Sequence, residues 1–460
     1  MDSRLVSQLS AIVGREHVSD AEAERLCAAY DGTGREYPPE AVIWPQTAAE
    51  TSRILALAHR EGVPVVVRGA GSGMTGGALP VKGGLVLATS RMNRILEIDP
   101  ANQLAVVEPG VVTGVLQAEV GRQGLFYPPD PASLKFCTIG GNVAENAGGP
   151  SAVKYGVTRD YVKGLEVALA DGRLIHTGAR TDKGVVGYDL TRLFVGSEGT
   201  LGVITKIILR LLPRPQARRT TLVMLDSLSQ AARLVAKALA RFTPCALEFM
   251  DRTTIGLTAE LLPLPLPSGV EAILIVEQDG SPLAVAAEAA ELAAFLEAEP
   301  GVRLVTQAQG QEETEAIWAA RRGVSPAAFK LRPHKISEDV VVPRTRIPDL
   351  VALAETLARE LDLVIFCFGH AGDGNIHLNI MLDRHDLRQA EAAQTARRRI
   401  FAQVIGLGGT LSGEHGVGIT KSEAISLEID PATLAAMRAI KQALDPAGIL
   451  NPGKIFPQNG

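Results

Sequence analysis

The sequence predicts an α+β protein with more than one domain. Strand-like and helical segments are mixed in the N-terminal part, two strand–helix–strand units follow residue 218, and the chain has 460 residues. A chain of this length usually forms two or more domains, each with its own hydrophobic core. The two later units suit an antiparallel sheet backed by helices, of ferredoxin-like type. A C-terminal helical segment completes the predicted fold.

Composition favours small-molecule chemistry. The apolar fraction of 46% and the charged fraction of 21% are those of an ordinary globular protein. A net charge of −5 without a basic block gives no attraction to nucleic acid or to an anionic membrane. No apolar run is long enough to cross a bilayer, so we expect a cytoplasmic protein that meets a membrane only through a partner.

The cysteines agree with that expectation. Cys27, Cys137, Cys245 and Cys367 lie far apart in the chain, with no closely spaced pair that would hold zinc or an iron–sulfur cluster. We expect all four to be reduced core residues.

The first elements lead to a glycine-rich stretch. Residues 41–44 are strand-like, and Thr47-Ala-Ala-Glu50 is a capping box for an amphipathic helix that ends at Gly62. A second strand, residues 63–67, then runs into Arg68-Gly-Ala-Gly-Ser-Gly-Met-Thr-Gly-Gly77.

This stretch is predicted to hold a diphosphate. Its glycines let consecutive backbone N–H groups face one anion, and Arg68 adds a positive charge. The spacing of Gly71, Gly73 and Gly76 matches G-x-G-x-x-G, but another strand follows at residues 85–89 where a nicotinamide-binding Rossmann unit needs a helix. A glycine-rich surface turn is the alternative.

The second glycine-dense stretch follows a strand at residues 104–108 and a helix capped by Thr113 that ends near Gly124. It runs through residues 127–133 and 138–149, and we expect a long functional loop in which backbone approaches a flat ligand. Asn142 and Asn146 offer donors and acceptors for a ring edge, and Thr138 offers a donor for a phosphate. A plain irregular loop is the alternative.

The remaining elements are read from periodicity. Asp171-Gly172 joins two strand-like runs as a hairpin, and Gly196-Ser-Glu-Gly-Thr-Leu-Gly202 leads into a strand that ends near a domain boundary at Gln216. The later predicted strands are residues 221–225, 246–250, 272–277, 302–306 and 340–342, and the later predicted helices are residues 230–240, 283–296, one containing Trp318 and Arg321, residues 350–360, and one capped by Asp430.

The third dense stretch, residues 368–379, carries two histidines. A two-residue turn at Asp373-Gly374 would place His370 directly opposite His377, with both imidazoles on one face. Residues 411–418 add Glu414 and His415 between glycines. Three of the eight histidines therefore fall in two glycine-rich stretches, which indicates a metal or catalytic site. A satisfied structural histidine is the alternative.

Taken together, these motifs resemble the FAD-linked D-2-hydroxyacid dehydrogenases, within the vanillyl-alcohol oxidase group that has a PCMH-type FAD-binding domain. The resemblance covers nearly the whole chain and is closest to the glycolate oxidase FAD-binding subunit and D-lactate dehydrogenase. It implies a PCMH-type FAD-binding domain of two α+β subdomains at residues 1–216, a cap domain for substrate at 217–410, and a segment at 411–460 that returns to the first domain.

The resemblance also implies site residues. Those expected to bind FAD are Arg68, Gly69, Ala70, Gly71, Ser72, Gly73, Pro131, Ser133, Thr138, Gly141, Asn142, Ala144, Ile204 and Asn451. Relatives with covalent flavin use a histidine in the first glycine stretch, whereas position 72 is serine here, so non-covalent FAD is expected. His370, His377 and Glu414 match residues that hold a divalent metal, either zinc, manganese or iron. Arg321 matches a residue that binds substrate carboxylate.

The implied reaction is oxidation of D-lactate or glycolate to the 2-oxoacid, with His415 as general base and flavin N5 as hydride acceptor. Electrons are expected to leave to an iron–sulfur subunit, an electron-transferring flavoprotein or quinone, and a homodimer is compatible with the sequence. The alternatives are a D-2-hydroxyglutarate-type dehydrogenase, a non-catalytic flavin subunit of an electron-transfer complex, and a metal-dependent hydrolase. The hydrolase would leave the two upstream glycine stretches without a purpose.

Overall fold

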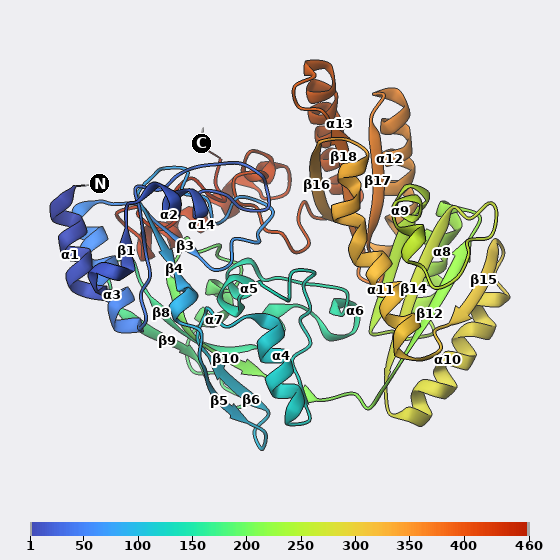
Figure 1. The fold of residues 1–460 in the computed structure, drawn as a ribbon, viewed down its shortest axis with the longest axis horizontal. Helices are drawn as coiled ribbons and strands as arrows, with labels where there is room; N and C mark the ends of the chain where they lie inside the picture. Colours follow the sequence, from blue (N-terminus) through green and yellow to red (C-terminus); the bar gives the residue numbers. More distant parts are fainter. Residues whose placement is uncertain (1, 458–460) are drawn as a thin grey trace. The chain divides into compact units, whose positions relative to one another are not determined.

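The computed structural model describes residues 2–457. The chain is divided into two compact units (Figure 1). The first contains the chain up to Gly148, Val157–Arg214 and the chain from Glu414 onward, and the second contains Gly149–Gly156 and Pro215–Gly413. The domain limits at residues 216 and 410 stay a prediction, and the grouping of Gly149–Gly156 with the second unit was not predicted from the sequence.

The first unit is a mixture of short strands and helices. Its helices are α1 (Ser3–Val13), α2 (Glu22–Cys27), α3 (Ala48–Glu61), α4 (Thr113–Arg122), α5 (Ile139–Glu145), α7 (Leu190–Phe194) and α14 (Pro431–Leu444). Its strands are β1 (Val18–Ser19), β2 (Ala41–Ile43), β3 (Val65–Arg68), β4 (Leu85–Ala88), β5 (Ile95–Asp99), β6 (Leu104–Val107), β7 (Leu125–Phe126), β8 (Val162–Ala168), β9 (Leu174–Gly178), β10 (Val203–Arg210) and β11 (Leu212–Pro213).

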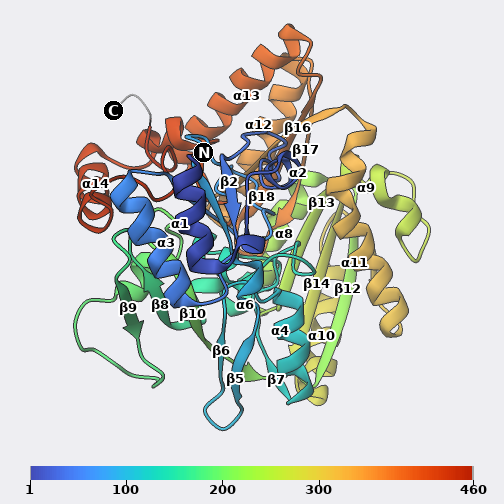
Figure 2. The ribbon, with the colours of Figure 1, turned by 60° about the vertical axis from the view of Figure 1, so that its left-hand side comes forward.

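These strands form two main sheets. One has the order β1-β2-β4-β3, in which β4 is parallel to both β2 and β3, and the other is antiparallel with the order β5-β6-β10-β8-β9. Helices α1 and α3 lie side by side (Figures 1 and 2), and a shared core joins Leu9 and Leu55 to Val203 of the second sheet. The predicted strand, glycine loop, strand order around residues 68–77 is confirmed.

Capping residues set the helix boundaries. Thr47 accepts a hydrogen bond from Glu50 N, and Gly62 ends α3 in the left-handed conformation, as predicted. Helix α14 begins after Asp430, also as predicted. The prediction for α4 was wrong by one residue, because Val112 is the cap and Thr113 is the first helical residue.

The second glycine-dense stretch is not the long loop expected from its composition. It contains helix α5, which begins after Thr138, whose hydroxyl accepts from Gly141 N, and ends at Asn146 with φ of 57°. Threonine and asparagine are turn formers, but they also cap helices, and here they cap both ends of one.

The second unit is built on one large sheet. Its helices are α6 (Ala152–Tyr155), α8 (Leu228–Leu239), α9 (Arg252–Thr258), α10 (Pro282–Glu297), α11 (Gly310–Ala327), α12 (Ile347–Glu360) and α13 (Leu387–Gly406). Its strands are β12 (Ala217–Leu225), β13 (Ala246–Asp251), β14 (Ala272–Gly280), β15 (Val302–Gln307), β16 (His334–Val341), β17 (Val364–His370) and β18 (Asn375–Leu382). Helix α13 was not predicted.

All neighbouring strands of this sheet are antiparallel, in the order β15-β12-β14-β13-β17-β18-β16. Helix α11 covers one face, where Ile317 and Val324 pack with Met224, Met250 and other apolar residues of the sheet. The alternate residues of the strands are buried as well, for example Phe249 and Val223. Residues on both faces of the sheet are therefore buried.

The predicted register of the hairpin β17–β18 was wrong by two residues. Residue His370 pairs with Asn375, and Phe368 pairs with His377. The connection is the four-residue loop 371–374 and not a two-residue turn at Asp373-Gly374. The buried loop explains the difference, because Gly372 N donates to Leu247 O on strand β13 and Asp373 N to His370 O.

Of the four free cysteines, three are buried, but Cys27 is exposed, so the expectation of a core position was wrong for that residue. Within residues 2–457, no helix combines the length and the apolar character that spanning a bilayer would require.

Candidate functional site

The first glycine stretch forms an open loop between β3 and β4. The backbone N–H groups of Ala70, Gly71, Ser72 and Gly73 have no acceptor in the part of the protein that the structure describes. Gly71 has φ of +69°, and a Cβ added there would lie 2.3 Å from Arg68 Nη2. Consecutive unpaired N–H groups on a glycine loop are what an anion such as a diphosphate needs.

The side chain of Arg68 supports this loop from within the unit. Its Nη1 donates to Tyr30 O over 2.8 Å, and its Nη2 to Cys27 O over 3.4 Å. Burial lowers the pKa of Arg68, and the neighbouring Asp31 carboxylate opposes that shift. The structure thus gives Arg68 two backbone partners that the sequence did not predict, and its predicted contact with a phosphate stays a prediction.

The two glycine stretches meet in the first unit. A Cβ on Gly69 would lie 2.3 Å from Thr138 Oγ1, and a Cβ on Gly140 would lie 2.4 Å from the Cβ of Pro109. Asn142 is buried and donates to Thr113 Oγ1 over 2.7 Å, so this amide has a partner within the protein. Glycine is required at these two contacts because backbone and side chains touch with no room between them.

The other predicted FAD residues lie in the same unit. Asn451 donates to Gly77 O over 2.9 Å and to Glu198 O over 2.6 Å, which ties the C-terminal segment to the first glycine loop. Ala144 O accepts from Glu198 N. Pro131 and Ser133 provide carbonyl acceptors for the turn that precedes α5, and Ile204 is buried on β10. The structure therefore brings all the predicted FAD residues into one unit.

The second unit brings the two histidines together. Residues His370 and His377 are buried on one face of the hairpin β17–β18, and their Nε2 atoms are 3.4 Å apart. Their rings are nearly perpendicular, with centroids separated by 5.1 Å. The register error did not separate them, because a shift of two residues leaves a side chain on the same face of a strand.

A buried carboxylate that the sequence analysis missed orients the first histidine. Glu248 on β13 is fully buried, and its Oε1 accepts from His370 Nδ1 over 2.7 Å. Its Oε2 forms an ion pair with Arg321 Nη2 of α11 over 2.6 Å. Burial opposes the charge of Glu248, but His370 and Arg321 outweigh it, so the pKa of this carboxyl is lowered. The available signal was a single acidic residue within the apolar strand 246–250.

Arg321, the predicted carboxylate binder, is itself buried. Its guanidinium lies over the Phe368 ring, 4.6 Å from the centroid. Its Nε has no hydrogen-bond partner within the described residues. An unpaired buried donor is costly unless a ligand supplies an acceptor, which is compatible with the predicted role.

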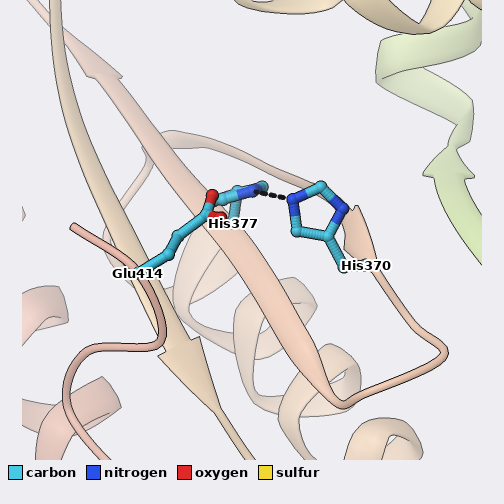
Figure 3. Close-up of side chains that lie close together, drawn as sticks. All are labelled: His370, His377 and Glu414. Carbon is cyan, nitrogen blue, oxygen red and sulfur yellow. Dashed lines mark hydrogen bonds between the residues drawn. The ribbon is translucent and has the colours of Figure 1, made fainter. Parts of the chain in front are cut away.

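The third predicted metal ligand joins this pair. Glu414 follows Gly413, the last residue of the second unit. One ligand atom from each of His370, His377 and Glu414 lies within 4.8 Å of the others, and Figure 3 shows the three side chains directed toward one another. His415 Nε2 lies 3.8 Å from Glu414 Oε1. The structure thus groups the residues that the sequence nominated for metal binding.

Two family models match the chain. One, described as FAD linked oxidases, C-terminal domain, matches residues 214–455, and the other, described as FAD binding domain, matches residues 39–178. The chain belongs to the FAD-linked oxidases. The predicted family, its FAD cofactor and its oxidoreductase class are thereby confirmed.

Named relatives extend the likeness of this FAD-linked oxidase over nearly its full length. It is 43% identical to the glycolate oxidase subunit GlcD of Bacillus subtilis, over 98% of this chain and 96% of the relative. It is 34% identical to a D-lactate dehydrogenase of Anaerostipes hadrus, over 91% and 89%. A solved structure of p-cresol methylhydroxylase with substrate bound is 18% identical, covers 99% of this chain and 97% of its own, and has a TM-score of 0.82. That likeness shows the fold and confirms the predicted PCMH-type α+β class.

Proposed function

We propose that this FAD-linked oxidase is a dehydrogenase that oxidises a small D-2-hydroxyacid, D-lactate or glycolate, to the 2-oxoacid. The relatives named glycolate oxidase subunit and D-lactate dehydrogenase support this substrate class. The observation that carries the proposal is the meeting of His370, His377 and the Arg321–Glu248 pair on one buried face of the sheet. That face offers nitrogen donors for a cation and a guanidinium for a carboxylate.

The chemistry of the donor set fits a divalent cation. Because an ionised carboxylate only accepts, Glu248 keeps the proton of a neutral His370 on Nδ1 and leaves a lone pair on Nε2. His377 Nε2 and a carboxylate oxygen of Glu414 complete the three ligands. Zinc, manganese and ferrous iron all accept two nitrogens and an oxygen. When bound, such a cation would lower the pKa of the substrate hydroxyl.

Two side chains of the protein complete the proposed reaction. Arg321 binds the substrate carboxylate through the buried Nε that has no partner in the described structure. His415 takes the hydroxyl proton, because a neutral imidazole nitrogen can act as a general base. When bound, FAD would supply the hydride acceptor for this oxidation. The structure supports His415 by its position next to the ligand Glu414 in the chain.

The flavin is proposed to be held without a covalent bond. The loop at residues 69–77 contains no histidine that could bond the ring, and its open backbone N–H groups suit a diphosphate. Acid precipitation should leave the flavin in the supernatant. A flavin that stays with the precipitated protein would refute this part of the proposal.

The electron acceptor is proposed to be a partner protein or quinone. The sequence has no closely spaced pair of cysteines for an iron–sulfur cluster, and the relative from Bacillus subtilis is named as a subunit. An iron–sulfur subunit or an electron-transferring flavoprotein would suit both facts. Rapid reoxidation of the substrate-reduced protein by air would count against a dedicated acceptor.

The deciding experiment is anaerobic mixing of the flavin-loaded protein with D-lactate, L-lactate, glycolate and D-2-hydroxyglutarate. Bleaching of the flavin by D-lactate or glycolate supports the proposal. Bleaching by D-2-hydroxyglutarate alone would favour the dicarboxylate enzyme. If no hydroxyacid reduces the flavin while dithionite does, the chain is a non-catalytic flavin subunit and the proposal fails.

A further inference from the structure

A second buried carboxylate of the second unit holds the residues just before Glu414. Asp339 on β16 is fully buried. Its two carboxylate oxygens lie 3.2 Å from Ser412 Oγ, and Oδ2 accepts from Gly413 N over 3.0 Å. Gly413 N also lies 2.8 Å from the Asp339 carbonyl oxygen. The chain is therefore fixed to β16 at the residue that precedes the proposed ligand.

Asp339 also belongs to the face of the sheet that carries the histidines. It pairs directly with His377 across β16 and β18. Directly opposed residues of an antiparallel pair project from the same face, with Cβ atoms about 4.5–5.5 Å apart. One carboxylate is thus placed to act on two of the three proposed ligands, through the backbone of Gly413 and across the sheet from His377.

The position of Gly413 leaves no freedom for the chain to shift. A Cβ on Gly413 would lie 2.5 Å from Asn375 Nδ2. That amide nitrogen donates to Asp339 O over 3.0 Å and to Val340 O over 3.2 Å. Asn375 and Asp339 therefore enclose Gly413 from two sides.

A third buried carboxylate, in the first unit, holds the residues just after His415. Glu198 accepts from Val417 N at Oε1 and from Gly418 N at Oε2, each over 2.7 Å. Glu198 is only 5% exposed. Thr75 adds a hydrogen bond from its hydroxyl to His415 O over 2.9 Å.

The segment between these carboxylates needs external support. Glycines at positions 413, 416 and 418 give its backbone more conformational freedom than other residues would. Hydrogen bonds from backbone N–H to a carboxylate are roughly twice as strong as those to a neutral acceptor. A buried carboxylate is costly without such donors, so each one holds its pair of donors in a fixed geometry.

We propose that Asp339 and Glu198 are positioning residues for the adjacent pair Glu414 and His415. Asp339 fixes Glu414 as a metal ligand, and Glu198 fixes His415 as the base. The inference rests on the proposed function, and it predicts that the two carboxylates affect different steps: Asp339 acts on metal affinity, and Glu198 acts on proton transfer.

The first test compares metal binding by the parent, Asp339→Asn and Asp279→Asn, measured with Mn²⁺ and Zn²⁺ in competition with a chelator. Asp279 is a buried carboxylate of the same sheet that binds Lys154 and Tyr155. Loss of an outer-shell partner typically weakens metal binding by about 10–100-fold. We expect that loss for Asp339→Asn only, with FAD content unchanged in both variants.

The possible outcomes distinguish a failure of the positioning role of Asp339 from a failure of the proposed metal site. A parent that binds no metal overturns the proposed metal site and, with it, the role of Asp339. A parent that binds metal, with equal affinity in Asp339→Asn, overturns the positioning role alone. If Asp339→Asn does not fold, Ser412→Ala removes one donor to the same carboxylate, and unchanged affinity in that variant would also overturn the role.

The second test measures flavin reduction in a single anaerobic turnover, in H₂O and in D₂O, for the parent, Glu198→Gln and Glu108→Gln. Glu108 is a buried carboxylate of the same unit that pairs with Arg94. A misplaced catalytic group costs up to about 10²-fold in rate. We expect Glu198→Gln to slow flavin reduction by up to about 10²-fold and to raise the solvent isotope effect. Its metal affinity should be unchanged.

A general loss of packing would slow the reaction without making proton transfer more limiting. An unchanged solvent isotope effect in Glu198→Gln therefore overturns the role of Glu198, as does an unchanged rate. If that variant does not fold, Thr75→Val removes the hydroxyl that donates to His415 O. It should shift the rate and the isotope effect in the same direction, and parent values for both would overturn the inference.

Discussion

Replacing Glu248 by glutamine should weaken metal binding without dismantling the fold. Glutamine preserves the volume of this fully buried side chain and one carbonyl acceptor, but it removes the charge shared by His370 and Arg321. The retained oxygen can serve only one of these two partners well. His370 then loses the acceptor that keeps its proton on Nδ1, or Arg321 loses its counterion.

The substitution should reduce both metal affinity and stability, and each loss has an expected size. Loss of an outer-shell partner of a ligating histidine costs about 10–100-fold in metal affinity, which is about 1.4–2.7 kcal/mol. Breaking a buried ion pair by removing one partner costs about 3–5 kcal/mol of stability. Because the amide remains a hydrogen-bond acceptor, we expect Glu248→Gln to fall below that range, and Glu248→Ala to reach it.

The assay is metal affinity by chelator competition together with the midpoint of thermal unfolding. Glu277→Gln is the matched control, because Glu277 is a buried carboxylate of the same sheet that binds Thr220 and Trp318. Both variants should lose stability, but only Glu248→Gln should lose metal affinity. Equal metal affinity in the parent and Glu248→Gln would refute the reasoning that Glu248 fixes the ligand tautomer.

Three further predictions concern residues of the first unit. His415→Ala should retain FAD and metal and lose about 10²- to 10⁴-fold in single-turnover flavin reduction, and a parent rate would exclude His415 as the base. Gly141→Ala should fold normally, since the new Cβ meets only Thr138 Oγ1 at 3.3 Å, yet bind FAD more weakly in a titration of the apoprotein; undiminished affinity would show that no ligand approaches this glycine. Burial lowers the pKa of Lys454 from 10.5 to about 8. The unfolded chain therefore binds more protons between these values, and the parent should gain stability relative to Lys454→Met as the pH rises from about 8 toward 10. A difference in unfolding midpoint that stays constant with pH would contradict that shift.

The sequence predicted local structure best where the signals were short-range. Thr47 and Gly62 are read directly as the two ends of α3, and both are observed. The prediction of a loop was wrong at α5, where Thr138 and Asn146 cap a helix. The high glycine content of this stretch had favoured a loop. Glycine lowers helix propensity, but burial of Ile139 and Val143 against the unit's core supplies the missing stability.

The carboxylates around the site could not be predicted because their partners are distant in the chain. Glu248 reaches His370 across 122 residues, and Glu198 reaches Val417 across 219. A lone acidic residue in an apolar strand indicates a buried charge, but only strand pairing and loop packing identify what it binds. Asp339 is the clearest example, since its link to Gly413 depends on a chain that returns to β16.

The paired histidines show why a site can be predicted even when its register is not. The hairpin was placed two residues out, so His370 faces Asn375 and His377 faces Phe368. Side chains alternate between faces along a strand, so an even shift changes the neighbour and preserves the face. The two imidazoles are therefore diagonal neighbours across the hairpin, and their ring centroids are 5.1 Å apart. Their Nε2 atoms are still only 3.4 Å apart. An error of one residue would have sent one ring to the opposite face of the sheet. The metal proposal therefore requires only that His370 and His377 project from the same face of the hairpin. This is a weaker requirement than a particular turn type at residues 371–374.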